Sequence, residues 1–197
     1  MSGSGTILES IINAGLEVAL VASDRPCRGL EVANAAGIEA LLVDRVDYGG
    51  FRAAFDRESY SKALAQVLVK YRIDLVAMAG FGTVLTGVFH EAFPGRVLNT
   101  HPSLLPAFKG WHAVPQALEA KVTESGCTVH IATEELDHGP VLAQRRVPVY
   151  GEDDEASLHE RIKDVERQLY PLVLTRVMAA LEHGQEPISV AGTLEEN

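Results

Sequence analysis

The chain has 197 residues, of which 47% are hydrophobic and 22% charged, and its formal net charge is −10. This length and composition fit one globular domain with a substantial core. No run of lysine or arginine occurs, so the composition excludes the basic surface of a protein that binds nucleic acid or an anionic membrane. Any phosphate that the protein binds must therefore be held by local groups.

No stretch reaches the ~18 consecutive apolar residues of a membrane span, and the polar start MSGSGT is not typical of a signal peptide. Cys27 and Cys127 show neither metal-ligand spacing nor a disulfide framework, so each is interpreted as a small buried residue. The sequence therefore predicts a cytoplasmic protein with a single domain over residues 1–197. Within it, a nucleotide-binding half (1–100) precedes a half with the catalytic loop, the later strands and a long helix (101–197).

Short β-branched runs alternate with helical patterns in the first half of the chain. Strands are predicted at residues 16–24, 38–43 and 74–79. One helical pattern begins at Ile7, and two others cover residues 29–37 and 56–71. This alternation predicts βαβ units, and therefore an α/β fold with a doubly wound, mostly parallel sheet and helices on both faces.

Further strands are expected at residues 96–100, 127–132 and 141–149. These later strands resemble the strands of hairpins, which pair antiparallel, so the sheet is predicted to be mixed. A helix is expected near residues 114–120, between the first two of these strands. The tail at residues 185–197 is expected to be coil or an edge strand.

A long helical pattern covers residues 155–183, and Pro171 inside it predicts a kink. One face of this helix is apolar and is expected to pack on the core. Its residues are Leu158, Ile162, Val165, Leu169, Leu172 and Val173.

The segment Ser2-Gly3-Ser4-Gly5-Thr6 leads directly into the first helical pattern. Backbone N–H groups at the start of a helix form a concave anion site, which suits a monophosphate. Disordered N-termini have the same composition, so this segment alone does not decide between the two interpretations.

Asn99 and His101 lie in the segment NTHPSLLP, at the carboxyl end of a predicted strand. The period of two places both side chains on one side of the strand, at the end where α/β sheets bind ligands. Further along, CTVHIATEELDHGP places His130 in a strand and Asp137 in an acidic loop.

This set of side chains is suited to acyl transfer onto an amine. An amide and a protonated imidazole can stabilise the oxyanion on a tetrahedral carbon, and a carboxylate can relay the proton that leaves the amine. Asn99, His101 and Asp137 are therefore the candidate catalytic residues. The chemistry requires neither a metal nor a covalent nucleophile, so Ser103 is not a candidate for attack.

Five segments together resemble the folate-dependent formyltransferases: SGSGT, MAGFGTVL, NTHPSLLPAFKG, TVHIATEELDHGPVLAQ and ERIKDVERQLYP. The resemblance runs from Ser2 to about residue 187, and N-x-H-P-S-L-L-P followed by L-D-x-G-P is a strong signature of that superfamily. It implies 10-formyltetrahydrofolate as co-substrate. It is nearest to the members that formylate the amino group of glycinamide ribonucleotide in de novo purine biosynthesis. Small-molecule partners and a monomer or homodimer are expected.

The resemblance implies roles residue by residue. It gives Asn99, His101 and Asp137 as the catalytic set. The phosphate loop would consist of Gly3, Ser4, Gly5 and Thr6, with Lys163 near the phosphate and Glu166 at the ribose hydroxyls. The folate would contact Phe81, Gly82, Thr83, Val84 and Leu85, with Ala132, Thr133 and Glu134 near its pterin edge.

Four positions depart from the family pattern. Thr83 stands where an arginine that contacts the folate is usual, Ile7 replaces an asparagine, and His138 replaces a glycine beside Asp137. The fourth departure is that Met1 abuts the phosphate loop, where the family has an apolar strand. We therefore expect the first strand of the fold to be missing from this sequence and the chain to be marginally stable.

Other activities remain open at this point. Formyltetrahydrofolate hydrolase and methionyl-tRNA formyltransferase share the signature, although they carry additional domains that this short acidic chain does not show. A catalytically silent domain that binds phosphate or folate is an alternative of a different class.

Overall fold

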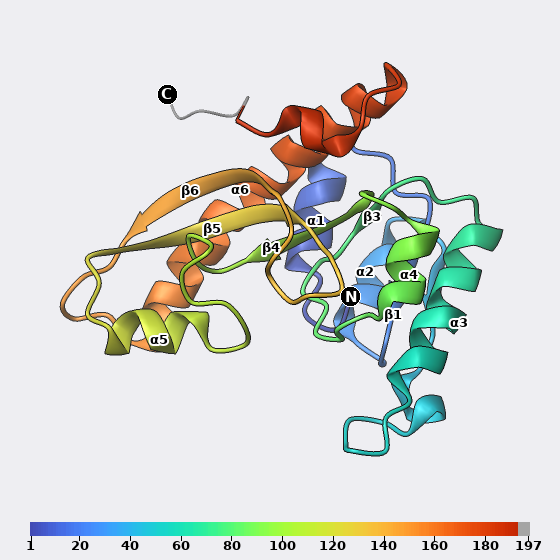
Figure 1. Cartoon of the computed structure of the whole chain (residues 1–197), viewed down its shortest axis with the longest axis horizontal. Coiled ribbons are helices and arrows are strands. Elements are labelled where there is room, and N and C mark those ends of the chain that lie inside the picture. Colours follow the sequence, from blue (N-terminus) through green and yellow to red (C-terminus); the bar gives the residue numbers. More distant parts are fainter. Residues whose placement is uncertain (193–197) are drawn as a thin grey trace. The chain divides into compact units, whose positions relative to one another are not determined.

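The computed structural model describes residues 1–192. The chain divides into two compact units, Met1–Val97 and a second unit that begins at Leu98 (Figure 1). The boundary lies inside strand β4 (Val97–His101), and the prediction of a single domain stays a prediction. No helix within residues 1–192 has the length and apolar composition needed to cross a membrane.

The first unit alternates helices with short strands. Its elements in chain order are α1 (Thr6–Asn13), β1 (Val21–Ser23), α2 (Arg28–Ala35), β2 (Ala40–Leu42), η1 (Arg45–Tyr48), α3 (Arg57–Lys70), β3 (Val76–Ala77) and α4 (Gly87–Ala92). β1 and β2 pair in parallel, with Val21 opposite Ala40. The βαβ unit expected in this part of the chain is therefore confirmed.

β1 is shorter than the run predicted at residues 16–24. Only Val21 to Ser23 have partners on β2, and a strand forms where a neighbour accepts its main-chain hydrogen bonds. Leu8 from α1 and Ala33 from α2 are buried together with Val21. The two helices therefore pack on β1 and hold it in place.

The bounds of helix α3 agree closely with the predicted range, because the sequence supplies an N-cap residue, Asp56. The carboxylate of Asp56 accepts a hydrogen bond from the backbone N–H of Ser59 at 3.0 Å, which satisfies one of the free donors of the first turn. Two elements of this unit were not predicted, η1 and α4. Both are short, with 4 and 6 residues, and neither shows a full period of apolar residues.

The second unit contains three strands and a long helix. Its elements are β4, α5 (Ala113–Glu119), β5 (Glu124–Ile131), β6 (Val141–Pro148), α6 (Glu155–Glu182) and η2 (Pro187–Val190). β4 pairs with β5 and β5 pairs with β6, both antiparallel. The protein therefore has an α/β fold with parallel and antiparallel strand pairs, as predicted for a mixed sheet.

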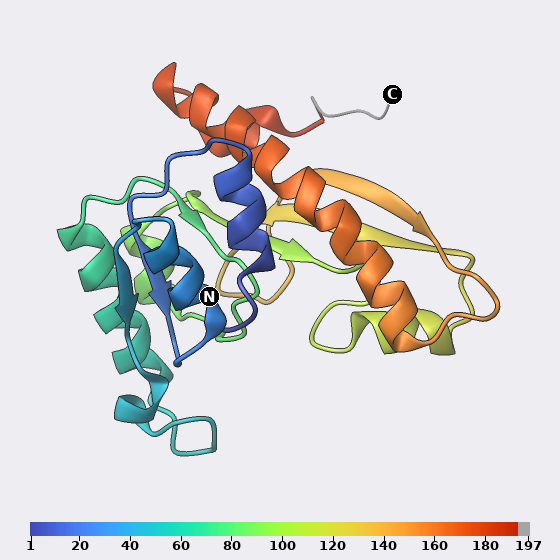
Figure 2. The same ribbon diagram turned by 180° about the vertical axis from the view of Figure 1, so that it is seen from behind.

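Helix α6 packs against β5 and β6, as Figure 2 shows from behind. It begins with a capping box in which Asp154 and Ser157 exchange hydrogen bonds, and it continues through Pro171. Leu158, Ile162 and Leu169 are buried on its apolar face as expected. The expectation was wrong for Leu172, which is 36% exposed, because this residue lies beside the stripe that faces the strands.

The segment after α6 was predicted to be coil or an edge strand. The prediction is wrong for Pro187–Val190, which form the 3₁₀ helix η2 with Pro187 and Val190 buried. η2 packs against α6, and this contact, which local sequence does not encode, fixes its conformation. The part of the expected tail from residue 193 onward lies outside the described residues.

Candidate active site

Strands β4 and β5 bring two candidate side chains together. Asn99 on β4 lies directly opposite His130 on β5, and residues opposite each other in an antiparallel pair have neighbouring side chains. Nδ2 of Asn99 lies 3.4 Å from Nε2 of His130. His101 is the last residue of β4 and is buried.

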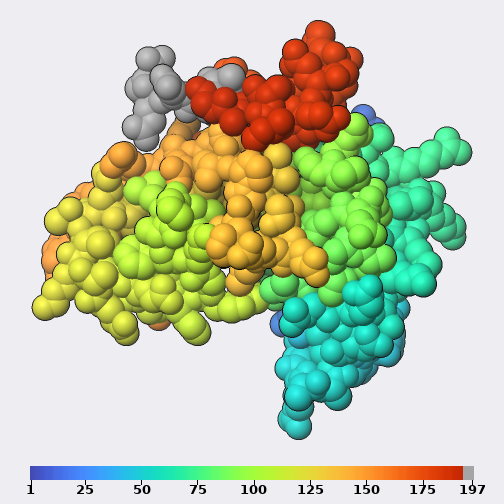
Figure 3. Space-filling view, viewed as in Figure 1, coloured from blue at the N-terminus to red at the C-terminus, as the bar shows by residue number. Residues whose placement is uncertain are grey.

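Asp137 lies in the loop between β5 and β6, a segment at the surface of the view in Figure 3. Its backbone has a φ of +57°, in the left-handed region that Asp and Asn tolerate better than most residues. Two residues later, Gly139 leaves no room for a side chain, since a Cβ there would lie 1.7 Å from the carbonyl oxygen of Ile131. This tight turn directs the Asp137 carboxylate inward, where it is buried.

The Asp137 carboxylate contacts the candidate set on both oxygens. Oδ2 lies 3.3 Å from Nδ1 of His101 and accepts a hydrogen bond from the backbone N–H of Gly110 at 2.9 Å. Oδ1 lies 3.6 Å from Nε2 of His130. The structure therefore brings Asn99, His101 and Asp137 into one cluster, joined through His130.

Both ring nitrogens of His101 face acceptors. Nε2 lies 2.8 Å from the carbonyl oxygen of Phe108, and Nδ1 faces the Asp137 carboxylate. A neutral imidazole has one N–H and can donate to only one of these acceptors, whereas an imidazolium donates to both. Each ring nitrogen of His101 therefore already lies close to an acceptor, one on the loop and one on Asp137.

For His130, burial favours the neutral ring. Burial lowers its pKa, and this desolvation outweighs the attraction of Asp137. A neutral ring donates from Nδ1 to the carbonyl oxygen of Ile131 at 3.1 Å and leaves Nε2 as an acceptor for the Asn99 amide. The sequence placed His130 in a strand without a role. The antiparallel register of β4 and β5 would have revealed it, but the sequence alone does not supply that register.

Main-chain groups of the NTHPSLLP segment form hydrogen bonds with Thr128 on β5. Thr128 donates its hydroxyl to the carbonyl oxygen of Ser103 at 2.6 Å and accepts from the N–H of Leu105 at 3.1 Å. The Ser103 hydroxyl donates to the carbonyl oxygen of Ala107 at 2.5 Å. This loop carries Phe108 and Gly110 to their contacts with His101 and Asp137.

Lys163 and Glu166 lie one turn apart on α6. The Thr100 hydroxyl donates to Oε1 of Glu166, and burial raises the pKa of this carboxyl. Nζ of Lys163 lies 3.8 Å from Oε2 of Glu160, a loose pair that leaves the ammonium available to an anion. Thr100 thus connects α6 to the strand that carries Asn99 and His101.

The candidate phosphate loop lies at the start of α1 in the first unit. Gly5 is the N-cap with a φ of +79°, and a Cβ there would lie 2.9 Å from Cα of Gly29. Ser4 and Thr6 have their hydroxyls 3.4 Å apart, and Gly3 has open space around it. Glycine at position 5 is therefore required by the backbone itself.

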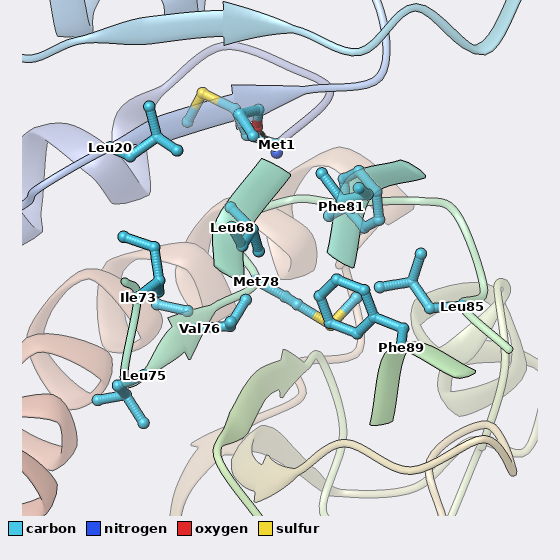
Figure 4. Close-up of a pocket in the computed structure, with 13 residues that line it drawn as sticks. Met1, Leu20, Leu68, Ile73, Leu75, Val76, Met78, Phe81, Leu85 and Phe89 are labelled. Carbon is cyan, nitrogen blue, oxygen red and sulfur yellow. Dashed lines mark hydrogen bonds between the residues drawn. The ribbon is translucent and has the colours of Figure 1, made fainter. Parts of the chain in front are cut away.

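The residues of the candidate folate segment in the first unit differ in how deeply they are buried. Thr83 is buried, donates to Oδ2 of Asp24 at 2.9 Å and accepts from Nη1 of Arg45 at 3.0 Å. Phe81 and Leu85 line an apolar groove (Figure 4), while Gly82 and Val84 are half-buried. Thr83 therefore has a local structural role in place of the usual arginine.

The remaining folate candidates lie in the second unit, just after β5. Ala132 is half-buried, and Thr133 and Glu134 are exposed. His138 is also exposed and pairs with Glu135 at 3.3 Å, so it points away from the cluster around Asp137. Cys127 is buried as expected, whereas Cys27 is only partly buried.

The chain belongs to the formyl transferase family, whose sequence pattern matches residues 1–174. Phosphoribosylglycinamide formyltransferase of Mycobacterium tuberculosis is 38% identical over 198 residues, covering 98% of this chain and 88% of the relative. The enzyme of the same name from Escherichia coli is 38% identical over 183 residues, covering 89% and 83%.

Solved structures agree with this assignment. Glycinamide ribonucleotide transformylase 1 from Symbiobacterium toebii is 43% identical with a TM-score of 0.79, covering 87% of this chain and 81% of that one. Phosphoribosylglycinamide formyltransferase from Streptococcus pneumoniae is 31% identical with a TM-score of 0.82, covering 90% and 95%.

Proposed function

We propose that this protein transfers a formyl group from 10-formyltetrahydrofolate to the amino group of glycinamide ribonucleotide. The observation that carries the proposal is the cluster in which His101 lies between Asp137 and the Phe108 carbonyl, with Asn99 on the same strand. An imidazolium and an amide near a buried carboxylate are the groups that acyl transfer to an amine requires. The names of the relatives support formyl transfer and the choice of acceptor.

In the proposed reaction the acceptor amine attacks the formyl carbon, and a new C–N bond forms. The formyl oxygen becomes an oxyanion, which the Asn99 amide and the His101 ring stabilise, with Nε2 of His101 exchanging the Phe108 carbonyl for the oxyanion as its partner. Asp137 takes the proton that the amine loses. The tetrahedral intermediate then collapses: the bond from the carbon to N10 of the folate breaks and N10 takes up the proton that Asp137 holds, so the products are the formylated amine and tetrahydrofolate.

Binding roles follow from the chemistry of the other candidates. In the first unit, the N–H groups around Gly3 to Thr6 would bind the nucleotide phosphate. In the second unit, the Lys163 ammonium is a candidate of its own for an anionic group of the substrate. Glu166 would accept hydrogen bonds from the ribose hydroxyls. The backbone of Phe81 to Leu85 and of Ala132 to Glu134 would bind the pterin edge.

The test is a stoichiometric assay with both substrates. We expect one equivalent each of formylated glycinamide ribonucleotide and tetrahydrofolate, and no loss of formyl groups when the acceptor is left out. Release of formate without the acceptor would indicate a hydrolase instead. Binding of both ligands without turnover would indicate a silent domain, and either result would contradict the proposal.

A further inference from the structure

Arg45, the first residue of η1, is a half-buried cation whose hydrogen-bond partners are both neutral. Its Nε donates to the carbonyl oxygen of Gly50 at 2.8 Å, and its Nη1 donates to the Thr83 hydroxyl at 3.0 Å. Burial lowers the pKa of Arg45, because desolvation disfavours the charged form. Charges that are taken out of water are normally paired with an opposite charge. Arg45 therefore lacks the anionic partner that its surroundings call for.

Asp24 is the acid on the other side of Thr83, and it is already paired. Its Oδ1 and Oδ2 accept from Nε and Nη2 of Arg25 at 2.9 and 3.1 Å. Oδ2 also accepts from the Thr83 hydroxyl at 2.9 Å. Thr83 thus lies between Asp24 and Arg45, and no direct bond joins the two in residues 1–192. The group formed by Asp24, Arg25 and Arg45 carries one positive charge in excess, in a chain of net charge −10.

Two aromatic rings hold the guanidinium of Arg45 in place. Its central carbon lies 3.8 Å from the ring centroid of Phe55 and 4.7 Å from that of Phe51. Phe55 packs in turn on the buried ring of Tyr60, with centroids 5.6 Å apart. These contacts orient the planar guanidinium before any ligand arrives. Of its nitrogens, only Nη2 has no acceptor among the described residues, so Nη2 is the donor that a ligand would use.

Phe51 adds an exposed aromatic surface to this group. The residue is 47% exposed and lies in the loop that follows η1, which is drawn in cyan in Figure 3. The central carbon of Arg25 also lies 4.1 Å from the centroid of this ring. An aromatic face beside guanidinium groups suits a ligand that carries an aromatic ring and a carboxylate together.

Thr83 places this group at the candidate folate segment. It is the middle residue of the range 81–85, and it stands where an arginine that contacts the folate is usual. Its side chain is short and buried, so it cannot supply that contact. Its hydroxyl instead accepts from Arg45, which brings a guanidinium from the neighbouring loop to the same place.

We propose that Arg45 binds a carboxylate of the glutamate part of 10-formyltetrahydrofolate and so replaces the arginine that position 83 lacks. The inference rests on the proposed function, which supplies the identity of the donor. Glutamate is the only part of this donor with a negative charge, and the p-aminobenzoyl ring attached to it matches the exposed ring of Phe51. The other anion of the reaction, the nucleotide phosphate, has no aromatic ring beside it and is expected at Gly3 to Thr6.

The test compares two ligands on the intact protein by titration calorimetry: tetrahydrofolate, and tetrahydropteroate, which lacks the glutamate. Tetrahydrofolate should bind about tenfold more tightly or better, and raising the salt concentration from ~0.05 to ~0.5 M should reduce this difference. Equal Kd values for the two ligands would overturn the inference alone, because neither measurement requires turnover. Binding of neither ligand would overturn it together with the proposed donor, and loss of formyl transfer with both Kd values as expected would overturn only the proposed reaction.

Substitution of Arg45 tests the location. Arg45→Gln should raise the Kd of tetrahydrofolate about tenfold and change that of tetrahydropteroate less than about twofold. Arg52→Gln, which removes an exposed positive charge from the same loop, should change neither value. If Arg45 serves only to hold the loop, Arg45→Gln will weaken both ligands equally, and that result would overturn the proposal.

Two further outcomes are decisive. A rise in the Kd of glycinamide ribonucleotide alone in Arg45→Gln would assign the group to the phosphate and overturn the proposal. If Arg45→Gln does not fold, Arg45→Lys takes its place, because it keeps the charge but lacks the planar set of donors. It should lose most of the preference for tetrahydrofolate, and an unchanged preference would exclude recognition of the glutamate by the guanidinium.

Discussion

Nδ2 of Asn99 lies 3.4 Å from Nε2 of His130, its direct partner across the antiparallel pair of β4 and β5. The amide of an asparagine can turn its oxygen or its nitrogen toward a neighbour. A neutral His130 that donates from Nδ1 to Ile131 leaves only an acceptor at Nε2. His130 thus fixes the orientation of the amide that is expected to stabilise the oxyanion, and we assign it as a positioning residue.

The first prediction concerns this contact. His130→Phe keeps a ring of similar size but removes the acceptor, so kcat should fall about 2- to 13-fold, which corresponds to the loss of one hydrogen bond of ~0.5 to 1.5 kcal/mol. KM for both substrates should change less than twofold, and His130→Gln should recover part of the loss. The exposed His112→Gln serves as the control in steady-state kinetics. An unchanged kcat in His130→Phe would remove His130 from the mechanism.

Asp137→Asn should reduce kcat by ~10² to 10⁴, because an amide cannot take the proton from the attacking amine. Folding should be preserved, since Asn also tolerates a φ of +57° and its side-chain oxygen can still accept from Gly110. Glu135→Gln in the same loop is the matched control. The measurements are single-turnover rates and thermal unfolding, and near-normal turnover in the Asp137→Asn variant would exclude proton transfer by this residue.

The pH dependence of stability should contain a contribution from His130. Burial lowers its pKa in the folded state below the unfolded value of ~6.5. The unfolded state therefore binds more protons near that pH, so stability is lost as the pH falls through about 6.5 and recovers as it rises. Urea unfolding at pH 7 and pH 5 should show a smaller loss in His130→Phe than in the unchanged chain, with His112→Gln as control. Identical losses would show that His130 is not buried in its neutral form.

A substitution at Gly3 can test the proposed phosphate loop without disturbing its backbone. Gly5 cannot test the loop, because its positive φ and its contact with Gly29 would strain any substitute. A side chain at Gly3 has open space, so Gly3→Asp should fold normally and place a negative charge beside the phosphate. We expect KM for the nucleotide to rise about tenfold or more from charge repulsion, and KM for the folate to stay unchanged. Gly3→Ala, which adds bulk without charge, should shift both values less than threefold, and equal effects of the two substitutions would argue against a phosphate at this loop.

Glu166→Gln should raise KM for the nucleotide with a smaller effect on kcat, as loss of uniform binding does. The amide oxygen can still accept from Thr100, so the connection between α6 and β4 is retained. Asp164→Asn, exposed on the same helix, is the control. If kcat falls as strongly as kcat/KM, Glu166 acts in the transition state and its assignment to the ribose is wrong.

The sequence by itself determined the α/β alternation and most of the helices, because apolar periodicity and the Asp56 cap are local signals. It also predicted the side chains of the candidate site, since Asn99, His101 and Asp137 lie in recognisable segments. Tertiary structure decided which residues share that site. The pairing register of β4 and β5 places His130 against Asn99, and the tight turn at Gly139 directs Asp137 toward His101. Strand register and η2 depend on contacts between distant residues, and no local propensity encodes such contacts.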